Sequence, residues 1–204
     1  MTQPTIEEVR QALDGYSKRS LEIPGRYAAG VMLLLFEKNG EQHVLLEKRS
    51  NLVEDHKGEI SLPGGRHEEE DDTLQATALR ETHEEVGVRP EDVEILGELD
   101  DFAPLSKYVI SPFVGAIPHP YDFVPNEREV AEIVELPFSV LTDRAYLRHE
   151  VKLSDGHLAA RPAFGYDGHF IWGATAMVLG RFLEIVSENE YPWTNSHPPP
   201  NKKS

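Results

Sequence analysis

The stretch LPGGRHEEEDDTLQATALRETHEEVGV, residues 62–88, decides the fold of this chain. Near its end, Glu81, Glu84 and Glu85 are spaced i, i+3 and i+4, so on an α-helix their carboxylates share one face. There they repel one another and face the negative end of the helix dipole, just before Gly87. Divalent cations such as Mg²⁺ or Mn²⁺ would relieve this repulsion, because hard ions prefer oxygen ligands. The pattern therefore predicts a metal site on the last turns of a helix.

The segment before this helix predicts a loop that approaches an anionic group closely. Gly64 and Gly65 carry no Cβ atom and permit positive φ values, so the backbone there can contact a bulky anion. Either Asp71 or Asp72 is expected to cap a helix that begins near Thr73. A glycine turn, a capped helix and carboxylates at the far end of the helix together indicate a site for metal and phosphate.

These residues resemble the Nudix box, the strand-loop-helix signature of Mg²⁺-dependent hydrolases that cleave nucleoside diphosphates linked to another group. The matching positions are Gly65, Asp72, Arg80, Glu81, Glu84, Glu85, Gly87 and Val88. Three departures are present: Asp72 stands where a glutamate is usual, one extra residue separates it from Gly65, and Thr82 replaces an aliphatic residue. The resemblance implies an α/β Nudix fold, in which a mixed β-sheet is sandwiched between helices.

The resemblance also assigns roles to the helix. Glu81 and Glu85 are the expected ligands of Mg²⁺ or Mn²⁺, whereas Glu84 is expected to be an additional ligand or the general base. Arg80 is expected to orient a helix glutamate through a charge-assisted hydrogen bond. Spacing alone leaves open which carboxylate takes the proton and how many metal ions bind.

A carboxylate downstream of the box often completes the metal site or acts as the base in Nudix enzymes. Glu129 and Glu132 are both candidates here, within an alternating segment that ends at Pro137. A solvated strand face explains each of these glutamates about as well.

Residues 48–61, KRSNLVEDHKGEIS, gather positive charge directly before the glycines of an otherwise acidic chain. A mixed run of this kind is usually a solvated loop, but its position favours a role in holding a phosphorylated ligand. The segment also resembles the signature of the coenzyme A diphosphatase branch of the Nudix family, through Leu45-Leu46-x-x-Arg49-Ser50, Gly58 and Leu62-Pro63-Gly64-Gly65. Leu62 replaces the usual phenylalanine, and Asp55 occupies a position that is often basic.

The branch resemblance implies hydrolysis of coenzyme A or an acyl derivative to 3′,5′-adenosine bisphosphate and 4′-phosphopantetheine. Arg49, Ser50 and Lys57, with Gly64 and Gly65, are then the expected substrate-binding residues, and Arg49 or Lys57 would face a phosphate. Two alternatives remain open: a Nudix pyrophosphatase for ADP-ribose, NADH or other nucleotide derivatives, and a Nudix-fold binding module without turnover. Such modules usually lose a box carboxylate, so the three present here favour an enzyme.

Composition restricts the partners and the compartment. The 204 residues suit one domain, predicted over residues 1–190 and followed by a mobile tail at 191–204. The net charge of −16 and the pI of about 4.9 argue against a nucleic-acid partner. Cysteine is absent, and no apolar run approaches the roughly 20 residues of a membrane span. We expect a cytoplasmic protein that acts on a small molecule, as a monomer or a homodimer.

Hydrophobic patterns predict the remaining elements. Strands are expected at 27–36, 43–47, 93–99, 107–117 and 129–136, with a hairpin formed by 147–153 and 157–163. Helices are expected at 6–21, lying over the domain, and at 172–186, largely buried.

Overall fold

The computed structural model describes residues 3–104, 107–154 and 157–187. The tail predicted for 191–204 and the turn at residues 155–156 lie outside these ranges, so neither prediction is tested. The helices are α1 (Ile6–Asp14), α2 (Leu74–Val86), α3 (Phe138–Thr142) and α4 (Gly173–Val186), with a short 3₁₀ turn at Pro90–Asp92. Across the described ranges, no helix is both long and apolar enough to cross a membrane.

In the described residues, ten strands form two sheets. The larger sheet contains β1 (Tyr27–Lys38), β2 (Glu41–Arg49), β3 (Ile60–Ser61), β4 (Gly64–Arg66), β5 (Glu94–Glu98), β6 (Tyr108–Ala116) and β7 (Val130–Pro137). Its order is β3-β2-β1-β6-β5, while β4 pairs with β1 and β7 pairs with β2. Among the strand pairs of the described residues, β1 and β6 are parallel and the others in this sheet are antiparallel, so the sheet is mixed. The smaller antiparallel sheet consists of β8 (Leu147–Ser154), β9 (His157–Tyr166) and β10 (His169–Ile171).

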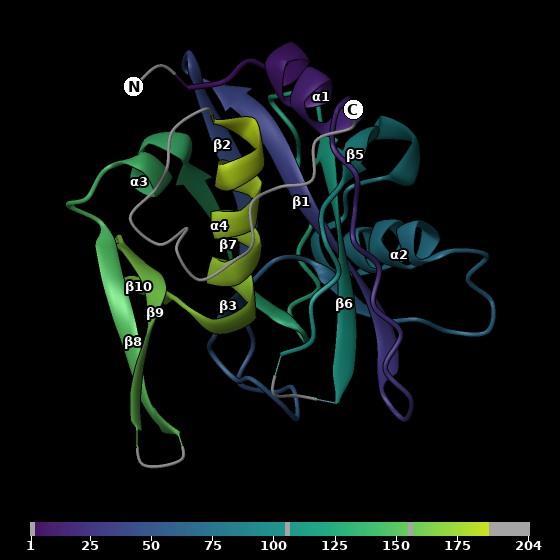
Figure 1. Cartoon of the computed structure of the whole chain (residues 1–204). Helices are drawn as coiled ribbons and strands as arrows, with labels where there is room; N and C mark the ends of the chain where they lie inside the picture. Colours follow the sequence, from purple (N-terminus) through teal and green to yellow (C-terminus); the bar gives the residue numbers. More distant parts are fainter. Residues whose placement is uncertain (1–2, 105–106, 155–156, 188–204) are drawn as a thin grey trace.

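The central strand β1 is buried on both faces, which explains its continuous apolar sequence. Leu33 and Leu35 belong to one core, together with residues of α1 and α4, whereas Met32 and Leu34 belong to a second core with residues of α2. Figure 1 shows α2 and α4 on opposite sides of the large sheet, with the β8–β9 hairpin extending away from it. The predicted arrangement of a mixed sheet between helices is confirmed.

Most of the predicted elements are present. The turn between β1 and β2 uses Asn39 and Gly40 at φ values of 56° and 80°, because a two-residue hairpin turn with native twist needs positive φ at both positions. Strand β7 ends at Pro137 and, within the part of the chain that the structure describes, pairs with β2 alone, as predicted for an edge strand.

The predicted helix over residues 6–21 is too long. It begins with a capping box between Thr5 and Glu8 and ends at Asp14, where Gly15 forms the C-cap. The chain continues without a helix to β1, because Gly15 and Pro24 both disfavour helical continuation. Tyr16, which lies just beyond the cap, is nevertheless buried.

A buried charged network connects α1, the end of β5 and α4. Arg181 of α4 donates to Asp100 at 2.8 Å, and the Tyr16 hydroxyl also donates to the same carboxylate. Arg19 donates two further hydrogen bonds, from Nε and Nη2, to Oδ2 of Asp100. Burial alone would raise the pKa of Asp100, but the hydrogen bonds from Arg19 and Tyr16 outweigh it and hold the pKa at about 2.

We predict that Asp100→Ala lowers the free energy of unfolding by about 3 kcal/mol, because it removes the carboxylate shared by Arg181, Arg19 and Tyr16 and leaves the buried Arg181 with Glu184 as its remaining carboxylate partner among the described residues. The comparison variant is Glu94→Ala, which removes a partner of Arg10 in an exposed ion pair and should cost less than about 1 kcal/mol. Urea unfolding at pH 7 measures both values. Equal costs for the two variants would contradict the assigned role of the network.

Candidate functional site

Helix α2 begins at Thr73, which is the N-cap residue. The Thr73 side chain accepts a hydrogen bond from Ala76 N at 3.0 Å, so the predicted capping by Asp71 or Asp72 is wrong. A cap must directly precede the first helical residue, Leu74, and both aspartates lie too early in the chain. The helix ends where predicted, with Gly87 in the left-handed conformation at φ 76°.

Asp71 instead anchors Arg80 from the side of the helix. Arg80 donates from Nε and Nη2 to the two carboxylate oxygens at 2.9 and 3.0 Å. This bidentate contact holds the pKa of Asp71 well below its ordinary value and raises that of Arg80. Asp72 is exposed, whereas Asp71 binds the box arginine Arg80. The acidic position of the box is therefore Asp71, and the match to Asp72 is wrong. The extra residue therefore lies between this acidic position and Arg80.

The fixed guanidinium of Arg80 reaches two of the helix glutamates. Its Nη1 atom lies 3.0 Å from Glu81 Oε1 and 3.2 Å from Glu84 Oε2. Nη2 also donates to the carbonyl oxygen of Arg66 at 3.3 Å, which ties α2 to the end of β4. This geometry agrees with the expected orienting role of Arg80. Glu84 is 53% exposed and lies at the rim of the site.

The two glycines allow β4 to lie directly against the helix carboxylates. Gly64 N donates to Glu85 Oε2 at 2.8 Å, and the Glu85 side chain is almost fully buried. A Cβ atom at Gly65 would lie 2.4 Å from the carboxylate carbon of Glu81, far inside van der Waals contact. Any larger residue at position 65 would therefore displace Glu81.

Glu47 of β2 is a further carboxylate of the site that was not among the residues predicted from the sequence. Its side chain is fully buried; Ser61 Oγ donates to Oε1 at 3.1 Å, but Oε2 has no hydrogen-bond partner among the described residues. The available signal was a glutamate directly following the apolar run Val44-Leu45-Leu46 of that strand. A charge at such a position is unfavourable unless it has a partner or a function.

Of the two downstream candidates, Glu129 lies on the side of the site. Its charge contributes to the raised pKa values of Glu47 and Glu81, and Asn126 donates to its carboxylate at 3.1 Å. Glu132 points elsewhere, toward Lys48 at 3.7 Å and His169 at 3.2 Å. We call Glu47, Glu81, Glu85 and Glu129 the acidic cluster.

The acidic cluster has four carboxylates and fewer positive charges beside it, since Arg80 contacts Glu81 and Arg49 lies near Glu47 and Glu85. Burial and the neighbouring Glu47 raise the pKa of Glu85 to about 9, and burial raises that of Glu47 to about 7. Burial also raises the pKa of Glu81. Arg49 gives only partial compensation, because its Nη1 atom lies 3.7 Å from Glu85 and 3.8 Å from Glu47, and its buried Nε has no hydrogen-bond partner within the described ranges.

These residues fit a hard divalent cation. Every donor in the acidic cluster is a carboxylate oxygen, one of them buried without a partner, and the raised pKa values show that the site favours added positive charge. In the described part of the chain, however, no three Asp, Glu or His side chains already converge on one point.

The remaining predicted substrate residues have different surroundings. Ser50 is buried, and its Oγ accepts from Leu52 N at 3.2 Å, so its side chain shapes the loop after β2. Lys57 is exposed on the same loop. The structure thus brings Arg49 to the acidic cluster and leaves Lys57 at the surface.

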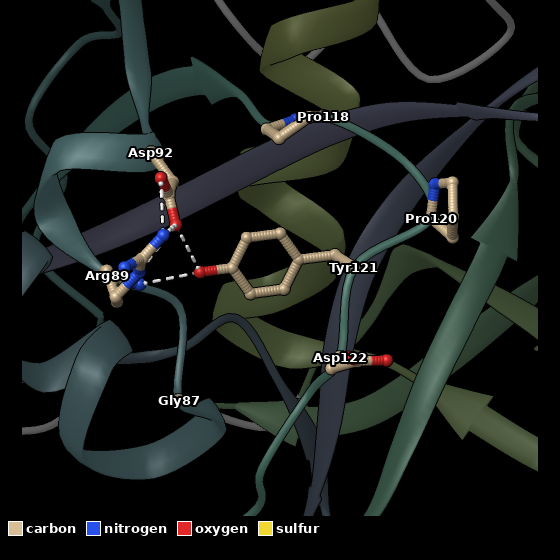
Figure 2. Close-up of a pocket in the computed structure, with 7 residues that line it drawn as sticks. All are labelled: Gly87, Arg89, Asp92, Pro118, Pro120, Tyr121 and Asp122. Carbon is tan, nitrogen blue, oxygen red and sulfur yellow. Dashed lines mark hydrogen bonds and ion pairs between the residues drawn. The ribbon is translucent and has the colours of Figure 1, made fainter.

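A hollow of about 430 Å³ lies at the C-terminal end of α2, and none of its lining residues belongs to the acidic cluster. Figure 2 shows Tyr121 pointing toward Arg89 and Asp92 inside it. Tyr121 donates to Asp92 at 2.7 Å, and Arg89 Nε donates to the same carboxylate at 2.8 Å. These polar groups bind one another, so we interpret the contact as a structural clamp on the proline-rich connection after β6.

Comparison with known proteins identifies the family. Residues 26–154 match the NUDIX domain family. The chain is 34% identical over 163 residues to NudL, an uncharacterized Nudix hydrolase of Enterobacter sp. (strain 638), covering 79% of this chain and 84% of that protein. It is 35% identical over 155 residues to NudL of Pectobacterium atrosepticum, covering 71% and 76%.

Among solved structures, the Nudix hydrolase RenU from M. smegmatis is 23% identical and gives a TM-score of 0.49, covering 64% of this chain and 83% of that one. The family match includes β4, α2 and the acidic cluster described above. The chain therefore belongs to the Nudix family and is a Nudix hydrolase.

Proposed function

We propose that the protein hydrolyses the diphosphate bond of coenzyme A or its acyl derivatives, with Mg²⁺ or Mn²⁺ bound at the acidic cluster. Family membership makes the protein a metal-dependent pyrophosphohydrolase. The metal assignment is carried by one observation: the carboxylates of the acidic cluster lie against Gly64 and Gly65 with too little positive charge beside them, and Glu47 and Glu85 are buried. The coenzyme A assignment is supported by the residues before these glycines, with Arg49 at the cluster and Lys57 on the adjoining loop.

In this proposal, Glu81 and Glu85 are the principal metal ligands, and the buried Glu47 is an additional candidate. A bound divalent ion supplies charge neutralisation on the diphosphate and lowers the pKa of water. Arg80 holds Glu81 and Glu84 in place, while Asp71 holds Arg80.

The remaining groups act on the substrate and the proton. The small residues Gly64 and Gly65 leave room for the diphosphate beside the cluster. Arg49, whose guanidinium lies beside Glu47 and Glu85, is our candidate for binding a phosphate oxygen. Glu84, at the exposed rim, is our candidate for the group that accepts the proton of the attacking water.

A Nudix pyrophosphatase of other specificity, for ADP-ribose, NADH or another nucleotide derivative, is the alternative that substrate tests must separate. A binding module without turnover is disfavoured, because Glu81, Glu84 and Glu85 are all present. The cytoplasmic location, the single domain over residues 1–190 and the choice between monomer and homodimer stay predictions.

We predict that coenzyme A is cleaved in Mg²⁺ or Mn²⁺ to products with the masses of 3′,5′-adenosine bisphosphate and 4′-phosphopantetheine. In a panel with dephospho-coenzyme A, ADP-ribose and NADH, kcat/KM should be about tenfold or more higher for coenzyme A, the value of one charge-assisted contact. Mass spectrometry identifies the products. Absence of coenzyme A turnover, with turnover of another panel member, would replace the proposed substrate.

We predict that Glu85→Gln reduces kcat/KM about 1000-fold or more while the circular dichroism spectrum stays unchanged. The amide keeps the shape of the side chain but removes a metal ligand, and several kcal/mol of transition-state stabilisation depend on the ion. Glu91→Gln, at an exposed position in the 3₁₀ turn, is the matched control and should retain full activity. Retained activity in Glu85→Gln would overturn the metal assignment.

We predict that the metal-free protein loses stability as the pH rises from about 5 to 9. The pKa of Glu85 is about 9 in the folded protein against an ordinary value of 4.5, so the folded state keeps a proton that the unfolded state has lost. Raising the pH therefore favours unfolding, by up to about 1.4 kcal/mol per pH unit for this carboxyl group. Urea unfolding in EDTA measures the effect.

Two comparisons isolate the contribution of the acidic cluster to this pH dependence. Glu85→Gln should flatten the decline, and Glu91→Gln should leave it unchanged. Added Mg²⁺ or Mn²⁺ should restore stability most strongly at the alkaline end, because the ion binds the deprotonated carboxylates. Identical pH profiles for the wild type and Glu85→Gln would contradict the assignment of the shift to this site.

A further inference from the structure

A second cluster, of aromatic and basic residues, lies at the edge of the large sheet where β1 and β6 begin. Tyr27 and Tyr108 are the first residues of these parallel strands and are paired in register, with ring centroids 6.0 Å apart. The Arg66 guanidinium carbon lies 3.9 Å from the Tyr27 ring centroid, and Lys107 Nζ lies 5.7 and 5.8 Å from the two rings. We call these four residues the tyrosine platform.

The charges of the tyrosine platform are not neutralised by the protein. Neither Arg66 nor Lys107 forms an ion pair with a carboxylate within the described ranges, although the chain carries a net charge of −16. Tyr27 is 43% exposed, and both basic side chains are exposed. Two cations held beside the exposed Tyr27 ring and the half-buried Tyr108 ring form a surface suited to a ligand that is both flat and anionic.

The tyrosine platform is directly connected to the acidic cluster by β4. Gly64 contacts Glu85, Gly65 faces Glu81, and Arg66 is the next residue along the strand. Two residues of an extended strand span about 7 Å. This separation is comparable with the distance from a phosphate to the base within a single nucleotide. The carbonyl of Arg66 also accepts from Arg80, which fixes β4 relative to the catalytic helix.

We propose that the tyrosine platform binds the nucleoside end of the substrate, a purine ring carrying its own phosphate, while the diphosphate lies at the acidic cluster. The planar Arg66 guanidinium stacks on Tyr27 and offers its other face to the base. Lys107, a compact charge beside both rings, binds the additional phosphate. This inference rests on the proposed coenzyme A activity, whose substrate carries a 3′-phosphate on adenosine, and it names the residues that distinguish this end of the molecule.

The tests use the full-length protein and two small ligands, 3′,5′-adenosine bisphosphate and AMP, in isothermal titration calorimetry with Mg²⁺ present. We predict that the wild type binds the bisphosphate more tightly than AMP, and that Lys107→Gln and Arg66→Gln weaken binding of the bisphosphate about tenfold. Lys107→Gln should also abolish the preference over AMP. Tyr27→Leu should weaken both ligands about tenfold, whereas Tyr27→Phe keeps the ring and should bind as the wild type does.

Arg144→Gln is the control for loss of one positive charge, because Arg144 is exposed in the turn between α3 and β8 and belongs to neither cluster. In turnover assays, Lys107→Gln should raise KM for coenzyme A about tenfold, leave kcat nearly unchanged and have little effect on dephospho-coenzyme A. Thermal unfolding of each variant checks that Arg66 and Tyr27 do not act only by attaching β4 to β1.

The outcomes separate this inference from the proposed function. If coenzyme A is not cleaved but the calorimetric pattern holds, the platform assignment stands and the substrate assignment fails. If coenzyme A is cleaved with the same KM by the wild type and all platform variants, the platform assignment is wrong and the proposed function stands. Failure of the wild type to bind the bisphosphate at millimolar concentration also overturns the platform assignment.

Discussion

Burial of the Glu47 and Glu85 carboxylates in the absence of a full countercharge is the constraint on which the rest of the site depends. Both side chains are buried, Glu47 on β2 and Glu85 on α2, and both pKa values are raised mainly by loss of water. Each deprotonated carboxylate therefore costs folding free energy unless a cation is supplied. The fold tolerates this cost because the surrounding cores are extensive on both faces of the sheet.

The site depends on close packing between the backbones of β1, β4 and the start of α2. A Cβ atom at Gly30 of β1 would lie 2.3 Å from the carbonyl oxygen of Leu74, and one at Gly64 would lie 2.4 Å from the carbonyl oxygen of Gly30. Only glycine allows β1, β4 and the start of α2 to approach to this extent. The same approach delivers Gly64 N to Glu85 and leaves Gly65 against Glu81. The glycines of β1 and β4 thus determine where the carboxylates can lie.

The helix that carries the carboxylates and the strands of the sheet could be predicted from the sequence, because hydrophobic periodicity and turn residues depend on residues that are close together in the chain. The sequence placed the helix start near Thr73 and the glycine-rich approach correctly. It did not identify Glu47, which comes to the site through the pairing of distant strands. The resemblance to the box was also assigned to Asp72 instead of Asp71. The correct choice depends on which carboxylate contacts Arg80, and Arg80 lies nine residues after Asp71 in the chain. Contacts of this range require the folded chain.

Two groups of buried carboxylates in the same protein illustrate how structural and functional charges differ. Asp100 is surrounded by donors from Arg19, Tyr16 and Arg181, and its pKa is lowered to about 2. Glu47 is at least as deeply buried, yet one of its oxygens has no partner in the described structure and its pKa is raised. A carboxylate with a complete set of donors gains nothing by binding a cation, whereas an incomplete one does. The direction of the pKa shift, together with the number of satisfied oxygens, therefore separates the network that holds α1 and α4 together from the cluster that is available to a metal ion.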